Sequence, residues 1–212
     1  MTKEQDTQGL TAAYDLDGPD ASRKLYREWA DTYDETFAQS LGYAYPQRIA
    51  ELFDDRADSG DTPVLDVGCG TGLVGAALRT GPVDGLDISP EMLRVAADKG
   101  DYRNLVEGDL TLTLPFGDGV FGGFVSAGTF THGHVGPDAL DELTRIARSG
   151  ALFVLGVNDQ VYRELNFAQK LDGLVAAAVI SEVEEVEGAI YQEGAEHDHA
   201  DDRFRALVFR RC

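Results

Sequence analysis

The sequence has few cysteines, few basic residues and no long apolar run. Its 212 residues include two cysteines, Cys69 and Cys212, which are too few for a disulfide framework. No apolar stretch is long enough to cross a membrane, and residues 1–6 are polar, without the basic-then-apolar pattern of a secretory signal. We therefore expect a cytoplasmic protein with no membrane partner.

Positive charge is scarce. Lys and Arg number 18 against 38 Asp and Glu, which gives a formal net charge of −20. Nucleic acid and anionic membranes both reward clusters of basic residues, so this balance argues against nucleic acid as a partner. The segment from Leu171 to Asp202 contains no Lys or Arg. We interpret it as a solvated acidic face; an acidic mouth for a cationic substrate is the alternative.

Strand and helix patterns alternate between residues 62 and 157, as in a parallel sheet covered on both faces. Ser89-Pro90-Glu91 is a helix start, with a capping hydroxyl, a proline and an acid in the first turn. In the last third of the chain, the sequence pattern predicts one helix and an antiparallel edge hairpin. The expected strands cover residues 64–67, 83–87, 102–107, 120–126 and 151–157, the helices 46–53 and 160–175, and the hairpin segments 177–187 and 203–209.

A glycine turn follows the first predicted strand. Val64–Val67 runs into Gly68-Cys69-Gly70-Thr71-Gly72, and a helix can begin at Leu73. Strand, glycine turn and helix bring backbone N–H groups close to a nucleotide-like ligand, and glycine allows positive φ or close approach of that ligand. The turn therefore predicts a nucleoside-type cofactor.

Two glycine patterns overlap in this turn. Gly70 to Gly75 matches G-x-G-x-x-G, the dinucleotide fingerprint, whereas Gly68 to Gly72 matches G-x-G-x-G with Asp66 two residues upstream. Asp87 lies at the end of the second predicted strand. A carboxylate there suits the ribose hydroxyls of a dinucleotide and of an adenosyl cofactor alike. Asp109 discriminates better, because a carboxylate there accepts a hydrogen bond from an adenine amine. Apolar residues that would sandwich the ring are Ile88, Met92 and Leu110.

Three segments together resemble the class I S-adenosylmethionine-dependent methyltransferases. They are Val64–Gly72, Gly85–Leu93 and Glu107–Leu110, and the likeness spans roughly residues 60–157 in order and spacing. The small-molecule branch, and methyltransferase-like proteins of the Williams–Beuren region type within it, are the most similar. Residues 26–34 also resemble the N-terminal lid helix of that branch.

The resemblance implies an α/β fold: a Rossmann-like, doubly wound, mostly parallel seven-stranded sheet with an antiparallel edge strand and N-terminal lid helices. It implies one domain over residues 1–212, with tail and lid helices (1–58), a cofactor-binding core (59–157) and a C-terminal helix and edge hairpin (158–212). Gly123 stands where many relatives carry an acid early in the fourth strand.

The same resemblance implies roles for the matched residues. The backbone of Gly68, Cys69, Gly70 and Gly72 would approach the methionyl part of S-adenosylmethionine. Asp66 would hold its amino group, directly or through water. Asp87 would bind the ribose and Asp109 the adenine amine. Ser126 and Ala127, at the end of the fourth strand, would border the cofactor.

Candidate catalytic residues are few. His132 and His134 follow the fourth predicted strand, where a parallel sheet binds its ligands, so either is a candidate base or substrate ligand, with packing as the default role. Tyr26, Trp29 and Tyr33 are candidate lid residues that line the substrate site. The sequence has two His-x-His pairs, His132/His134 and His197/His199, which could suggest a metal site. Nothing in the sequence places the two pairs together, so we expect no metal.

We therefore expect in-line methyl transfer from S-adenosylmethionine to a small-molecule acceptor by a monomer or homodimer. An NAD-type oxidoreductase is an alternative, although only 12 residues separate Gly75 from Asp87. A non-catalytic S-adenosylmethionine-binding protein is another, because the acid at position 123 is missing.

Overall fold

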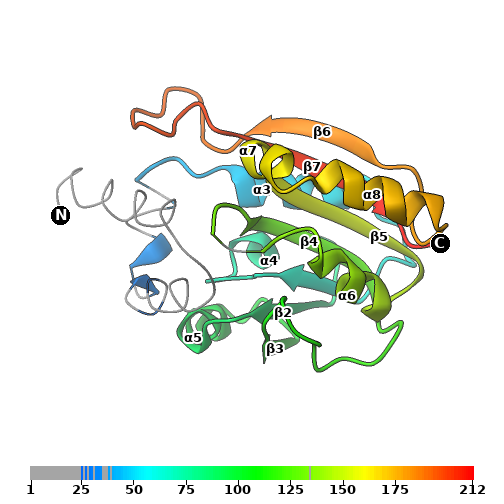
Figure 1. Cartoon of the computed structure of the whole chain (residues 1–212). Helices are drawn as coiled ribbons and strands as arrows, with labels where there is room; N and C mark the ends of the chain where they lie inside the picture. The colour runs from blue at the N-terminus through cyan, green and yellow to red at the C-terminus, as the bar shows by residue number, and fades with distance from the viewer. Residues whose placement is uncertain are drawn as a thin grey trace.

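The computed structural model describes residues 25, 27, 29, 30, 32–34, 38, 40–133 and 135–212. In this part of the chain a seven-stranded sheet has the order β3-β2-β1-β4-β5-β7-β6 (Figure 1). The strands are β1 (Val64–Val67), β2 (Val83–Asp87), β3 (Asn104–Glu107), β4 (Phe121–Phe130), β5 (Ala147–Asn158), β6 (Glu184–Ala189) and β7 (Arg203–Arg210). The helices are α3 (Tyr45–Asp54), α4 (Leu73–Ala77), α5 (Pro90–Lys99), α6 (Ala139–Ile146), α7 (Asp159–Glu164) and α8 (Phe167–Ala176).

The first five strands are parallel. β1 pairs with β2 and with β4, β2 pairs with β3, and β4 pairs with β5. β7 is antiparallel to β5 on one side and to the edge strand β6 on the other. The expected fold class, a doubly wound and mostly parallel sheet with an antiparallel edge, is confirmed.

Two apolar clusters cover the two faces of the sheet. One joins α6, α7 and α8 to the strands, and the other joins α3 and α4 to them. β1, β4 and β5 are buried along most of their length, as expected for strands covered on both faces. Helices on both faces leave the strand ends open, and there the loops define a site.

A stack of three phenylalanines fixes the register at the centre of the sheet. Phe124 of β4 pairs with Phe153 of β5, which pairs with Phe209 of β7. The ring centroids lie 4.2 Å and 4.6 Å apart, with nearly parallel planes. Stacking across three neighbouring strands joins the antiparallel edge to the parallel core.

Several element boundaries differ from those expected. The helix expected over residues 160–175 is two helices, because Asn166 takes a left-handed conformation with φ 56° and starts α8. β4 runs on to Phe130, four residues beyond its expected end, and β6 begins only at Glu184 and ends at Ala189, two residues beyond the expected segment 177–187. At α5 the Ser89 hydroxyl accepts a hydrogen bond from the Met92 N–H and Pro90 is the first residue, as expected.

The tail expected over residues 1–18 lies outside the described residues, as do several positions of the expected lid helix. Among the described residues, none of the helices has the length and apolar character needed to span a bilayer.

Replacing the central ring of the phenylalanine stack is expected to cost stability. Phe153 is fully buried, so Phe153→Ala removes its contacts with both neighbours and leaves a cavity. We expect the free energy of unfolding to fall by about 3–5 kcal/mol, measured by urea denaturation. Phe153→Leu, which keeps most of the volume, should lose less than half as much. Equal losses in the two variants would contradict this account.

Candidate active site

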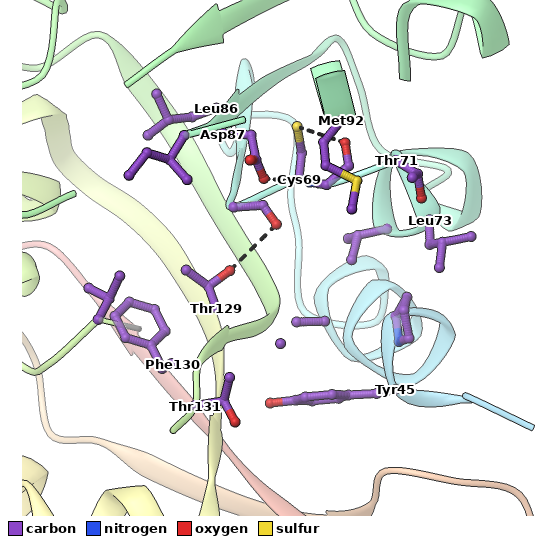
Figure 2. Close-up of a pocket in the computed structure, with 18 of the residues that line it drawn as sticks. Tyr45, Cys69, Thr71, Leu73, Leu86, Asp87, Met92, Thr129, Phe130 and Thr131 are labelled. Carbon is purple, nitrogen blue, oxygen red and sulfur yellow. Dashed lines mark hydrogen bonds between the residues drawn. The ribbon is translucent and has the colours of Figure 1, made fainter. Parts of the chain in front are cut away.

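A pocket opens at the carboxyl ends of β1, β2 and β4 (Figure 2). From β1 the sheet continues to β2 on one side and to β4 on the other, so the connections diverge there. In open α/β sheets such a divergence point is where ligands bind. The described lining residues are Tyr33, Tyr43, Tyr45, Pro46, Gly68–Thr71, Leu73, Val74, Leu86–Ile88, Met92, Gly108–Thr111, Ala127–Thr131, Val135, Asn158, Ile190 and Tyr191.

The glycine turn between β1 and α4 forms one wall. Its path requires glycine, because φ is 69° at Gly68, 52° at Gly70 and 94° at Gly72. A Cβ on Gly68 would lie 2.0 Å from the Thr129 hydroxyl oxygen, whereas a Cβ on Gly70 would meet no atom within 4 Å. Gly70 therefore leaves open space at the pocket wall, which suits close approach of a ligand to the backbone.

Asp87, the last residue of β2, holds this turn in place. Its Oδ2 accepts a hydrogen bond from the Gly70 N–H at 2.8 Å, and its Oδ1 accepts one from the Ser89 N–H at 2.9 Å. Burial raises the pKa of this carboxyl, while the N–H donors oppose the shift. Asp87 lines the pocket, so it is both a support of the turn and a candidate ligand for hydroxyl groups.

Asp66 lies beneath the turn and is not among the residues that line the pocket. Its Oδ2 accepts a hydrogen bond from the Tyr102 hydroxyl at 2.7 Å, and that hydroxyl accepts one from the Gly75 N–H at 3.2 Å. Its other oxygen, Oδ1, is buried with no hydrogen-bond partner among the described residues. Burial raises the pKa of Asp66 to about 7, and the charge of Asp87 adds to the shift.

Gly72 and Gly75 make room for Tyr102. A Cβ on Gly75 would lie 2.4 Å from the Tyr102 hydroxyl, and one on Gly72 would lie 2.9 Å from its ring. Neither glycine lines the pocket. The last glycine of the G-x-G-x-x-G pattern therefore serves the packing of a tyrosine under the turn.

The other expected cofactor residues are mostly brought together. Ile88, Met92, Asp109 and Leu110 line the pocket beyond Asp87. Asp109 Oδ1 accepts hydrogen bonds from the N–H and the hydroxyl of Thr111, at 2.9 Å and 2.6 Å. The structure thus brings these apolar side chains and this carboxylate into one part of the pocket lining.

Three other expected site residues, Ser126, Trp29 and His132, are not among the lining residues. Ala127 lines the pocket, but the Ser126 hydroxyl is buried and donates to the Val67 carbonyl at 2.7 Å. Tyr33 lines it, whereas Trp29 packs edge-on against Tyr33 at 5.1 Å outside the lining. His132 is not a lining residue. Two candidates, Tyr26 and His134, lie outside the described residues.

Gly123 lies near the amino end of β4, away from the pocket. A Cβ there would meet the Asp61 carbonyl oxygen and the Phe53 ring, each at 2.5 Å. Phe53 of α3 and the chain before β1 therefore occupy the space that an acidic side chain would need. The missing acid leaves the described pocket lining unchanged.

Sequence reasoning missed the far end of the pocket. Tyr43, Tyr45 and Tyr191 line it together with Asn158, whose Oδ1 caps α7. Tyr43 forms an isolated antiparallel bridge with Tyr191, nearly 150 residues later in the chain. Tyr43 and Tyr45, close together at the start of α3, could have indicated an aromatic lining from the sequence. No sequence pattern marks Tyr191, which lies in the acidic segment.

Asp34 ties the N-terminal segment to the turn. Its Oδ1 accepts a hydrogen bond from the Thr71 hydroxyl at 2.6 Å, and its Oδ2 pairs with the Lys99 ammonium at the end of α5. Tyr33, next to it, lines the pocket. The contact places Tyr33 against the glycine turn.

The pocket, its glycine turn and the sheet order define the class I methyltransferase fold. Residues 65–155 match the model of the family described as "Methyltransferase domain". The chain therefore contains a class I S-adenosylmethionine-dependent methyltransferase domain. Human methyltransferase-like protein 27 is 34% identical over 145 residues, which cover 65% of this chain and 58% of that protein. The chain thus spans little more than half the length of this curated relative.

Two further comparisons show how widely the core is shared. The bovine 18S rRNA (guanine-N(7))-methyltransferase is 42% identical over 65 residues, 30% of this chain and 23% of that protein. The solved structure of the [4+2]-cyclase SpnF has a TM-score of 0.65 and 17% identity, and covers 92% of this chain and 97% of its own. That level of identity shows a common fold alone.

Stability is expected to depend on pH through Asp66. Its carboxyl pKa is about 7 in the folded protein and near 3.8 when exposed, so the folded state holds the extra proton between these values. Stability from this group is therefore lost as the pH rises from 4 to 7. Asp66→Asn removes the dependence. We expect its unfolding free energy, relative to the parent protein, to rise by on the order of 2 kcal/mol between pH 5 and pH 8.

Urea denaturation at the two pH values, without added ligand, measures this difference. Tyr102→Phe is the control, because it removes the hydrogen bond that favours the Asp66 carboxylate and should extend the loss of stability to higher pH. Parallel pH profiles for Asp66→Asn and the parent protein would exclude the assignment.

Breaking the Asp34 contact is expected to speed ligand release. Asp34→Ala removes the acceptor for Thr71 and the partner of Lys99, so the segment that carries Tyr33 is held less firmly. We expect S-adenosylhomocysteine to dissociate about threefold to tenfold faster in stopped-flow displacement, equivalent to roughly 1 kcal/mol. Thr71→Val should produce part of the effect, and the two changes should not add. Independent, additive effects would argue against a direct contact.

Proposed function

We propose that the chain is a methyltransferase that uses S-adenosylmethionine to methylate a small molecule. The observation that carries the proposal is Asp87, a half-buried carboxylate at the carboxyl end of β2 that binds the glycine turn and also lines the pocket. A ribose diol donates two hydrogen bonds, and a carboxylate in this position accepts them. One residue would thus couple the shape of the turn to the bound nucleoside.

The rest of the cofactor fits the remaining surfaces. The adenine would lie between Ile88, Met92 and Leu110, with its amine toward Asp109. The methionyl part would extend along Gly68, Cys69 and Gly70, past the open space beside Gly70. Asp66, with its unpartnered oxygen under the turn, would act on the amino group through the turn or a water rather than from the pocket wall.

The cofactor supplies an electrophilic methyl group, so the chain's own residues have to position the acceptor and exclude water. Tyr33, from the N-terminal segment, and the Thr129–Thr131 end of β4 would enclose the reacting groups. An acceptor that is protonated at working pH would need a base. His132 and His134 remain our candidates for that base.

A small-molecule acceptor agrees with the charge of the chain. Ribosomal RNA, named for the bovine relative, is a polyanion and would meet a protein with a formal net charge of −20. The pocket is lined by apolar, aromatic and neutral polar side chains together with Asp87 and Asp109. We also propose that the protein is cytoplasmic, because its two cysteines are too few for a disulfide framework.

Removing the Asp87 carboxylate tests the cofactor assignment. Asp87→Ala removes a charged acceptor from the ribose and a support from Gly70, so we expect the dissociation constant for S-adenosylmethionine to rise about 10- to 100-fold in calorimetry. Glu107→Ala is the matched control, because Glu107 pairs with Asp87 across β2 and β3 but does not line the pocket. It should bind as tightly as the parent protein.

An unchanged dissociation constant in Asp87→Ala would refute the assignment. Tight binding of NAD instead of S-adenosylmethionine would favour the oxidoreductase alternative. Binding without methylation of any compound in a broad metabolite panel would favour a non-catalytic binding protein. His134→Ala is expected to lower turnover more than cofactor affinity.

A further inference from the structure

The part of the pocket lining across from Asp87 includes three tyrosines (Figure 2). Tyr43 and Tyr45 come from the start of α3, and Tyr191 comes from the segment after β6. Their rings contact one another: centroids lie 6.1 Å apart for Tyr43 and Tyr45, and 5.9 Å apart for Tyr43 and Tyr191. Phe204 of β7 stacks on Tyr45 at 4.4 Å and fixes its plane.

The Tyr45 hydroxyl is fully buried, and its proton has no acceptor among the described residues. The Gly128 amide acts on its oxygen and opposes the rise in pKa, but burial dominates and holds the pKa well above its ordinary value, so the group is a neutral phenol. An amide can only donate, so the phenol proton still lacks an acceptor. Burying a donor without an acceptor costs free energy, which a ligand would recover.

Two glycines reserve space for these hydroxyl groups. A Cβ on Gly156 would lie 2.2 Å from the Tyr45 oxygen, and one on Gly128 would lie 2.8 Å from the Tyr43 oxygen. Figure 2 shows the Tyr45 hydroxyl turned toward Thr131 at the end of β4, across the pocket from Asp87 and Cys69. The phenol donor therefore faces the end of the pocket opposite the adenine subsite.

We propose that Tyr45 orients the methyl acceptor, and that the acceptor is a small aromatic molecule without an anionic group, whose carbonyl oxygen or ring nitrogen accepts a hydrogen bond from the Tyr45 hydroxyl. The proposal rests on the proposed function, because it assigns the space beyond the methionyl part to the acceptor. Tyrosine rings offer flat faces for an aromatic ring.

The charge of the lining excludes anionic acceptors. Among the described residues that line the pocket there is no Lys, Arg or His, whereas Asp87 and Asp109 are both acidic. A carboxylate or phosphate on the acceptor would enter a lining of its own sign, in which no described side chain is a cation that could pair with it. An uncharged ring with one lone-pair acceptor matches the groups that are present.

Fluorine NMR on the protein loaded with S-adenosylhomocysteine tests the proposal. The probes are 4-fluoroacetophenone, 1-ethyl-4-fluorobenzene, which has a similar shape but no acceptor atom, and 4-fluorobenzoate. We expect both neutral probes to bind and 4-fluorobenzoate to bind at least tenfold more weakly. Cyclohexyl methyl ketone should compete poorly, because it keeps the carbonyl but loses the flat ring.

Tyr45→Phe isolates the hydrogen bond. It should weaken 4-fluoroacetophenone about fivefold, the loss expected for one neutral hydrogen bond, and leave 1-ethyl-4-fluorobenzene and S-adenosylhomocysteine unchanged. Tyr162→Phe is the control, since the Tyr162 hydroxyl bonds to Glu185 and does not line the pocket.

Three outcomes overturn the inference and leave the proposed function standing: 4-fluorobenzoate binding as tightly as the ketone, equal competition by the cyclohexyl ketone, or equal effects of Tyr45→Phe on both neutral probes. Failure of the parent protein to bind S-adenosylhomocysteine overturns the proposed function and this inference together.

Discussion

The site depends on two carboxylates that hold one backbone turn. Asp87 binds the turn from the side through Gly70, and Asp66 supports it from below through Tyr102 and Gly75. Asp66 is wholly buried and Asp87 is half-buried, and the charge of Asp87 raises the pKa of Asp66. Carboxylates placed this close are tolerated only because N–H and O–H donors are fixed against them. The polar groups therefore specify the shape of the turn, at some cost in stability.

The arrangement of strands places this turn where a ligand can use it. β1 lies between β2 and β4, so the turn that follows β1 lies beside Asp87 at the end of β2 and beside Thr129 in the last part of β4. The Thr129 hydroxyl donates to the Val67 carbonyl at 2.8 Å, and a Cβ on Gly68 would collide with it. The extension of β4 beyond its expected end therefore closes the second side of the turn.

The sequence predicted which residues around the glycine turn meet in one pocket, because those residues follow local rules. A strand, a glycine turn and a capped helix are readable from spacing, and the ends of parallel strands converge, so Asp87 and Asp109 could be placed in one pocket. Distant contacts were not readable. Asp66 was expected to hold the ligand's amino group directly or through water, and the sequence did not show that Tyr102, 36 residues later, donates a hydrogen bond to one of its oxygens beneath the turn. Ser126 was expected at the pocket, but its neighbour Ala127 lines it.

The acceptor end was missed for a related reason. Tyr43 and Tyr191 meet through an isolated bridge, and the Tyr45 ring is set by Phe204 of β7. These contacts exist only once the antiparallel edge has folded against β5, and no local pattern predicts that pairing. The match to the methyltransferase family covers residues 65–155, which include Asp66, Asp87 and Asp109 but none of these tyrosines. The shared segment therefore carries the carboxylates that we propose for the cofactor, while the segments before and after it carry the tyrosines that we propose for the acceptor. Because the two sets lie in different parts of the chain, acceptor choice can change without disturbing the glycine turn, and the acceptor of a relative that shares mainly the core does not transfer to this chain.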